Sequence, residues 1–167
     1  MTGNKPDAAP PQGTRDAPFD VLAESRRLQR SVRAGALATN DREGRPFASL
    51  VNVATGLDGS PILLLSRLAM HTNHLEADPH CAILLAETGK GDPLAHPRLT
   101  IVGTAARDSD PALRERFLSR HPKSALYADF GDFSFWRVTV EWAHLNGGFG
   151  KAGQVAGADL LSPVACA

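Results

Sequence analysis

The distribution of apolar residues along this chain predicts a mostly antiparallel β structure with a few short helices. Apolar runs and apolar–polar alternation predict six strands, at 36–40, 46–55, 61–66, 81–87, 98–107 and 135–145. An Asp-Gly pair in the turn 57–60 favours a hairpin between the second and third strands. Because strands and helices do not alternate regularly, we expect a small antiparallel barrel rather than a parallel nucleotide-binding sheet.

Three segments have the spacing and end signals of helices. The first lies within 19–35, with Asp20 as its N-cap, and the second covers 71–78, before a proline. The third covers 110–121 and begins with Asp110 as cap and Pro111 at its first position. In the last strand, the alternation predicts that Trp136 and Trp142 lie on the same face.

The chain is expected to form one domain between two tails. Residues 1–18 hold four prolines and almost no large apolar side chains, which predicts a disordered N-terminal arm. Residues 19–153 contain all the predicted helices and strands. Residues 154–167 have no clear pattern and are expected to be a C-terminal tail.

Composition narrows the class of protein. The residues are 43% apolar and 22% charged and the formal net charge is zero, which argues against a nucleic-acid binder. No apolar run approaches the roughly 20 residues of a membrane helix, and the N-terminus lacks a signal-peptide core. We therefore expect a cytoplasmic protein with no membrane partner. The two cysteines, at 81 and 166, do not form a disulfide framework.

A polar cluster stands between two apolar runs in 63–85. Ser66 and Arg67 end a predicted strand, and His71 and Thr72 begin a predicted helix. A helix N-terminus, a guanidinium and two hydroxyls together suit an anion such as a phosphate. The alternative is that Ser66 and Thr72 are ordinary caps and His71 is a surface residue. We predict no metal site, because His71 and His74 have no acidic third ligand at a usual spacing.

Several longer motifs resemble a known family. They include SRLAMHT at 66–72, GDPLAHPRLTIVG at 91–103 and AHLNGGFGKA at 143–152. Together they resemble the FMN-binding split-barrel proteins related to pyridoxamine 5'-phosphate oxidase, and within them the haem-utilisation branch. The resemblance covers residues 19–153. It implies a mainly β, α+β fold: a six-stranded antiparallel split barrel with flanking helices, in a homodimer with FMN between the subunits.

The resemblance also implies which residues bind the cofactor. By analogy, one group would hold the FMN phosphate: Ser66, Arg67, His71 and Thr72. Ser49, Leu50 and Val51 on the second strand would run beside the isoalloxazine ring, and Arg98 would contact the ring or the ribityl chain. Trp136 and Phe149 would come from the partner subunit. No catalytic residue is assigned.

The first functional expectation is an FMN-dependent oxidoreductase acting on a small molecule. The second strand lacks the Arg and Lys of pyridoxamine phosphate oxidases, so we do not expect that substrate. One alternative is a haem-binding protein whose axial ligand is His71, His74, His96 or His144. The haem-utilising relatives carry an iron-ligating histidine near their end, and the sequence has no histidine beyond His144. For this reason FMN is the first expectation for the cofactor and haem is the alternative. The other alternative is a non-catalytic flavin carrier.

Overall fold

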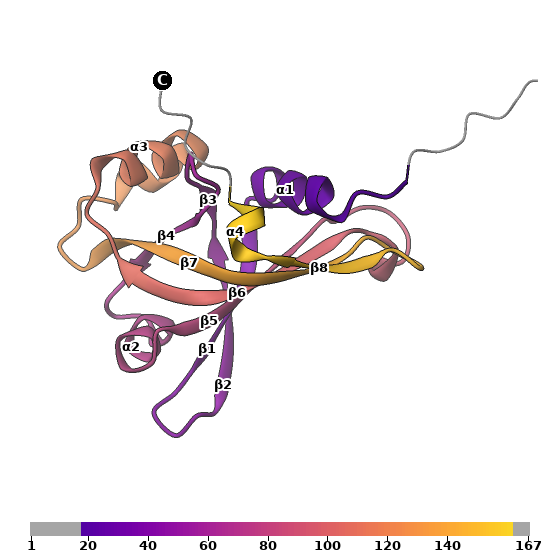
Figure 1. Cartoon of the computed structure of the whole chain (residues 1–167). Helices are drawn as coiled ribbons and strands as arrows, with labels where there is room; N and C mark the ends of the chain where they lie inside the picture. Colours follow the sequence, from indigo (N-terminus) through magenta and orange to yellow (C-terminus); the bar gives the residue numbers. More distant parts are fainter. Residues whose placement is uncertain (1–17, 162–167) are drawn as a thin grey trace, which may run out of the picture.

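A single antiparallel sheet, curled into a half-barrel, organises the molecule (Figure 1). The computed structural model describes residues 18–161. Within them the strands are β1 (Ala34–Asn40), β2 (Pro46–Asn52), β3 (Ala54–Thr55), β4 (Pro61–Ser66), β5 (His80–Ala86), β6 (Arg98–Arg107), β7 (Phe133–Asn146) and β8 (Ala152–Ala156). The order across the sheet is β2-β1-β5-β6-β7-β4-β3, and β8 pairs with β7. The mainly β, α+β split-barrel fold expected from the sequence is confirmed.

The predicted second strand, 46–55, is two strands in the structure. It breaks at Val53, whose N–H donates to the Arg33 carbonyl at 2.8 Å. β2 pairs with β1, whereas β3 pairs with β4 across the predicted Asp-Gly turn, in which Gly59 has φ +92°. Because β2 and β3 are adjacent in the chain but lie at opposite ends of the sheet order, this break brings the two edges of the sheet together.

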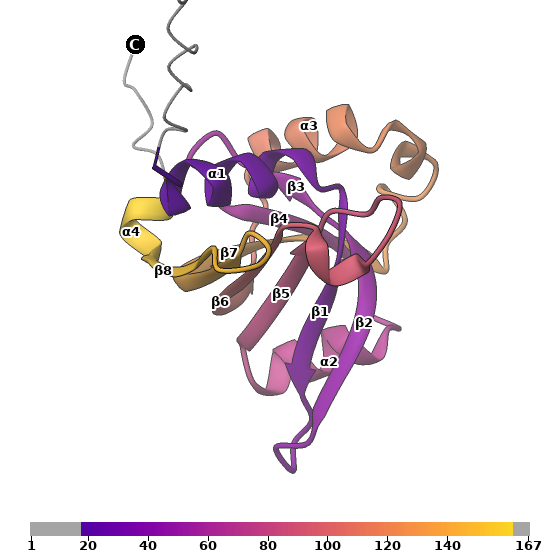
Figure 2. The same ribbon diagram turned by 90° about the vertical axis from the view of Figure 1, so that its right-hand side faces the viewer.

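The helices lie close to their predicted positions. They are α1 (Val21–Ser31), α2 (Met70–Ala77), α3 (Pro111–Arg120) and a fourth, α4 (Gly157–Leu160), that was not predicted. Asp20 accepts from the Ala23 N–H and Asp110 from the Ala112 N–H, so both predicted N-caps are confirmed. Short 3-10 turns occur at Pro93–Ala95 and Pro122–Leu126. The α1 and α3 helices lie at one end of the molecule, and α2 lies beside the β1–β2 hairpin at the other (Figure 2).

The predicted domain boundary at residue 153 is too early. β8 extends to Ala156 and α4 follows, with Leu160 completely buried. The Arg26 guanidinium on α1 donates to the Asp159 carbonyl at 2.6 Å, which holds α4 against the domain. The predicted N-terminal arm and the end of the predicted C-terminal tail lie at 1–17 and 162–167, outside the described residues.

A bulge in β7 changes which side chains enter the core. Val102 pairs with Trp142 but the next residue, Gly103, pairs with Val140, so Glu141 is an extra residue on β7. Trp136 is 3% exposed inside the barrel, whereas Trp142 is 37% exposed on the outer side. The prediction that the two tryptophans share a face is therefore wrong, because one inserted residue reverses the alternation.

Nothing in residues 18–161 forms a helix long and apolar enough to cross a membrane.

Candidate functional site

The polar residues after β4 form a connected cluster with β2 and α2. The Ser49 hydroxyl on β2 lies 3.0 Å from Nδ1 of His71 in the first turn of α2. The Thr72 hydroxyl donates to the Ser66 carbonyl at 2.6 Å, and the Ser66 hydroxyl donates to the Asp132 carboxylate at 2.7 Å. The structure thus brings together the predicted residues of β2, β4 and α2. Asp132 lies in the loop before β7, and no sequence signal indicated its contact with Ser66.

The hydroxyls of Ser66 and Thr72 stabilise the chain itself. Thr72 is completely buried, and the Ser66 hydroxyl also accepts the Leu68 N–H at 3.1 Å. Arg67 is exposed, and its guanidinium makes no hydrogen bond or ion pair with any residue of 18–161. Arg67 and the second ring nitrogen of His71 are therefore the groups that remain for an anion.

Burial controls the charge of His71. The half-buried position lowers the pKa of His71, and the neighbouring His74 lowers it further. At neutral pH the imidazole is therefore uncharged. With Nδ1 held by Ser49, its Nε2 is left to donate or to accept a hydrogen bond, according to the tautomer.

The outer side of the sheet carries an apolar surface. Strand registers place Leu50, Ala36, Leu84, Thr100 and His144 in one row across β2, β1, β5, β6 and β7. The adjacent row contains Ala48, Ala38, Ala82, Val102 and Trp142. We call these two rows the outer face. Leu50 is 80% exposed and Leu84 is 40% exposed, so the face is open to solvent along the described chain.

The predicted ring-contacting residues of β2 divide between two sides of the sheet. Leu50 belongs to the outer face, whereas Ser49 and the buried Val51 point towards the inner side. This follows from the alternation of side chains along a strand.

Arg98 and Phe149 lie together, but far from the polar cluster. Arg98 pairs with Asn146 at the end of β7, and its guanidinium donates to the Leu94 carbonyl at 3.0 Å. It shares an open cavity of about 450 Å³ with the fully exposed Phe149. Ser66 pairs with Phe133 at the start of the same strand, which is 14 residues long. The two groups therefore lie at opposite ends of β7.

Trp136 lies inside the barrel of its own protomer. Its indole is among the buried core residues, its Nε1–H donates to the Ser134 hydroxyl at 3.2 Å, and the Arg107 guanidinium lies 5.4 Å from the ring centroid. The structure therefore places Trp136 with neither the polar cluster nor the Arg98 cavity.

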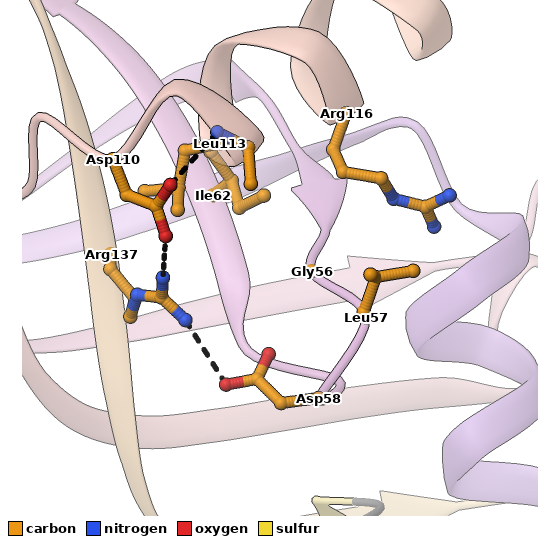
Figure 3. Close-up of a pocket in the computed structure, with 9 residues that line it drawn as sticks. Gly56, Leu57, Asp58, Ile62, Asp110, Leu113, Arg116 and Arg137 are labelled. Carbon is orange, nitrogen blue, oxygen red and sulfur yellow. Dashed lines mark hydrogen bonds and ion pairs between the residues drawn. The ribbon is translucent and has the colours of Figure 1, made fainter. Parts of the chain in front are cut away.

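A further cavity, of about 170 Å³, is lined in part by an ion-pair network around Arg137 (Figure 3). Arg137 on β7 lies 3.1 Å from Asp58, 2.8 Å from Asp108 and 3.8 Å from Asp110. A backbone hydrogen bond from Asp110 and the bond from Arg137 lower the pKa of Asp108. This network of one guanidinium and three carboxylates ties β7 to the β3–β4 turn and to the start of α3.

The chain is similar in sequence and in structure to several known proteins. The chain is 41% identical over 129 residues to a non-canonical chloroplastic haem oxygenase, HOZ, of Arabidopsis thaliana, and covers 39% of it with 73% of its own length. It is 32% identical over 136 residues to the haem oxygenase HutZ of Vibrio cholerae, covering 75% of each chain. A solved haem-binding protein from Mycobacterium smegmatis superposes with a TM-score of 0.81 at 32% identity, over 86% of this chain and 61% of that one.

The chain thus spans about two fifths of the Arabidopsis protein and three fifths of the mycobacterial one. The family model for pyridoxamine 5'-phosphate oxidase matches residues 21–147. That match covers the barrel from α1 through β7, including the polar cluster and Arg98. The chain therefore belongs to the pyridoxamine 5'-phosphate oxidase family.

Proposed function

We propose that this protein binds haem on the outer face and acts on it as a haem oxygenase. The observation that carries the proposal is His144, an exposed imidazole on an exposed apolar face, with Arg98 two residues before its partner Thr100 on β6. The names of the two curated relatives, both haem oxygenases, support it. Bound haem would supply an iron centre for oxidation by dioxygen.

The residues of the outer face suit a flat apolar macrocycle with acidic side chains. His144 makes no hydrogen bond or ion pair with any described residue, so a ring nitrogen is available to iron. Leu84, Val102 and Trp142 offer apolar contact, and Arg98 offers a forked donor for a propionate. These side chains would bind the haem, orient it and exclude water from it.

The other candidate histidines are less well placed. His74 Nδ1 lies 3.0 Å from the Thr39 hydroxyl, and its ring packs edge-on against Phe47. His96 Nε2 lies 3.1 Å from the Lys90 carbonyl. His71 sits in the polar cluster and lies on the inner side of β2, away from the outer face.

Haemin titration of the purified protein tests this proposal. We expect a Soret band that saturates at one haem per chain and that shifts or weakens in His144→Ala but not in His96→Ala. Addition of ascorbate in air should bleach the band, and exclusion of oxygen should prevent the bleaching. An unchanged Soret band in His144→Ala would show that another group ligates iron, and no spectral change in wild type would end the haem proposal.

FMN binding is a second candidate, favoured by the polar cluster. Arg67 is unpaired within the described chain and lies beside the first turn of α2, where backbone N–H groups favour an anion. We expect Arg67→Ala to weaken FMN binding by about 1–3 kcal/mol, the usual value of a charge-assisted hydrogen bond. Quenching of flavin fluorescence measures this, with Arg42→Ala as an exposed control. FMN that binds but is reduced by no donor would indicate a flavin carrier.

We also propose a homodimer formed through the outer face. A protomer places Arg98 and the polar cluster at opposite ends of β7, and a second copy that supplied one of them would let one cofactor contact both. The exposed apolar rows of the outer face suit such a contact, with the cofactor in the groove between the two copies.

A further inference from the structure

Four arginines of α1, α3 and the segment after α1 line one pocket, which has a volume of about 250 Å³. Both helices lie at the end of the molecule opposite to α2 (Figure 2). The lining of the pocket consists of Arg30, Arg33, Thr55, Arg116, Ser119 and Arg120. No carboxylate from the described part of the chain lines it.

Backbone carbonyls hold three of these guanidiniums in place. Arg120 donates to the Ser31 carbonyl at 2.6 Å, and Arg33 donates to the Arg120 carbonyl at 3.4 Å. Arg116 donates to the Thr55 carbonyl through two nitrogens, at 3.3 and 3.2 Å. Figure 3 shows its guanidinium turned away from Arg137 and the aspartates around it. The fold therefore orders these side chains, and Arg116 also lines the neighbouring cavity that contains Asp58 and Asp110.

The alternative to ligand binding is a purely structural role, in which these arginines cap the C-terminal ends of α1 and α3. Each helix C-terminus carries only about half a negative charge, however, and carbonyls are neutral dipoles. The three full positive charges of Arg33, Arg116 and Arg120 already exceed what the two helix ends can balance. Burial lowers the pKa of Arg120, and the charges of Arg33 and Arg116 lower it further, which is the effect of positive charges close to one another.

We propose that this arginine pocket binds a small multiply charged oxyanion, of the phosphate or diphosphate class. Planar guanidiniums donate two parallel hydrogen bonds to such groups, and the hydroxyls of Thr55 and Ser119 lie on the same lining. The site is separate from the polar cluster and from the outer face. Its ligand is thus additional to haem or FMN.

Calorimetric titration with sodium pyrophosphate and with inorganic phosphate, at constant ionic strength, tests the proposal. We expect one saturable site for pyrophosphate, with weaker binding of phosphate. Arg33→Gln should weaken pyrophosphate binding by about tenfold or more, since it removes one charge-assisted donor pair. Arg114→Gln is the matched control: it removes one arginine from α3 whose partner is Asp129, outside the pocket.

Thermal unfolding separates a binding role from a structural one. If like charges repel in the empty pocket, Arg33→Gln should raise the melting temperature without ligand and reduce the increase that pyrophosphate produces. No saturable binding, or equal weakening by Arg33→Gln and Arg114→Gln, would overturn the proposal. So would a lower melting temperature of Arg33→Gln combined with unchanged pyrophosphate affinity, which would assign the arginine to helix capping alone. The haemin spectrum of Arg33→Gln should match wild type.

Discussion

The environment of His71 predicts a measurable pH dependence of stability. Burial and His74 lower the pKa of His71 in the folded protein, so the unfolded chain binds the proton more readily. Stability should therefore fall as the pH drops below the unfolded value of about 6.5 towards the lowered folded pKa. We expect His71→Asn to be less sensitive to pH in this window, as measured by urea unfolding between pH 5 and 7.5.

His80 serves as a control, because its pKa is shifted in the opposite direction to that of His71. The hydrogen bond to Asp78 raises the pKa of this exposed histidine. The contribution of this hydrogen bond to folding stability is complete below about pH 6.5 and is lost as the pH rises through the raised pKa of the folded protein. An NMR titration should show His71 protonating at lower pH than His80. The reverse order would contradict the burial of His71.

The Cys81 thiol should be unreactive in the folded protein. Burial raises the pKa of Cys81 to about 12, and the charges of Asp78 and Glu141 contribute. At pH 8 only about one thiol in ten thousand is then a thiolate, the reactive form. In a Cys166→Ser variant, a thiol reagent at pH 8 should label Cys81 only after unfolding. Rapid labelling of the native protein would show that this part of β5 opens readily.

At the scale of elements, the bulge at Gly103 sets the shape of β6 and β7. A Cβ on Gly103 would lie 1.9 Å from the Thr139 carbonyl oxygen, so the strands would have to separate. We expect Gly103→Ala to lower the free energy of unfolding by about 1–3 kcal/mol, as for other overpacked sites. Chemical denaturation measures this. Gly131→Ala, where a Cβ would meet nothing within 4 Å, is the control and should change little.

The docking of α4 is a second prediction at this scale. Leu160 is completely buried, and Gly157 approaches β7 so closely that a Cβ would lie 2.0 Å from the Val140 carbonyl oxygen. We expect Leu160→Ala to cost about 2–5 kcal/mol of unfolding free energy, the range for buried leucines. Leu57→Ala, at a site 67% exposed, should cost far less. Equal effects would mean that α4 is not part of the cooperative unit.

Elements with strong local signals were predictable, and elements defined by tertiary contact were not. Asp110 and Pro111 determine the start of α3 locally, and the Asp-Gly turn determines the β3–β4 hairpin. β8 and α4 depend on β7 and α1, and nothing in 154–160 indicates those partners. The bulge at Glu141 is likewise a property of two paired strands. It moved Trp142 out of the core, although the alternation of β7 alone placed it inside.

The same distinction holds for the candidate site. Ser66, Arg67, His71 and Thr72 are close in sequence and stay close in the fold. The contact of His71 with Ser49 was not predicted, since it joins elements that the chain separates by about 20 residues. The hydrogen bonds that occupy the hydroxyls of Ser66 and Thr72 could not be read from the sequence, because one of their partners is the distant Asp132.

At the scale of the whole molecule, the outer face is the surface that the proposed homodimer would bury. It exposes Leu50, Leu84 and Trp142, and four of its ten residues are alanines. Burying such a surface contributes about 25 cal/mol per Å² of apolar area. A second copy would also bring its own Arg98 cavity or polar cluster towards the first.

A charge placed on the outer face should therefore separate the subunits. We expect a dimeric mass in solution for wild type and a monomeric mass for Leu84→Arg, since an unpaired buried guanidinium is strongly unfavourable at an interface. Leu126→Arg is the matched control: Leu126 is 78% exposed in a 3-10 turn away from the outer face, so its variant should remain dimeric. Light scattering after size-exclusion chromatography measures the molar masses of wild type and of both variants. A monomeric wild type would exclude the dimer, and it would leave haem binding by His144 as a property of a single protomer.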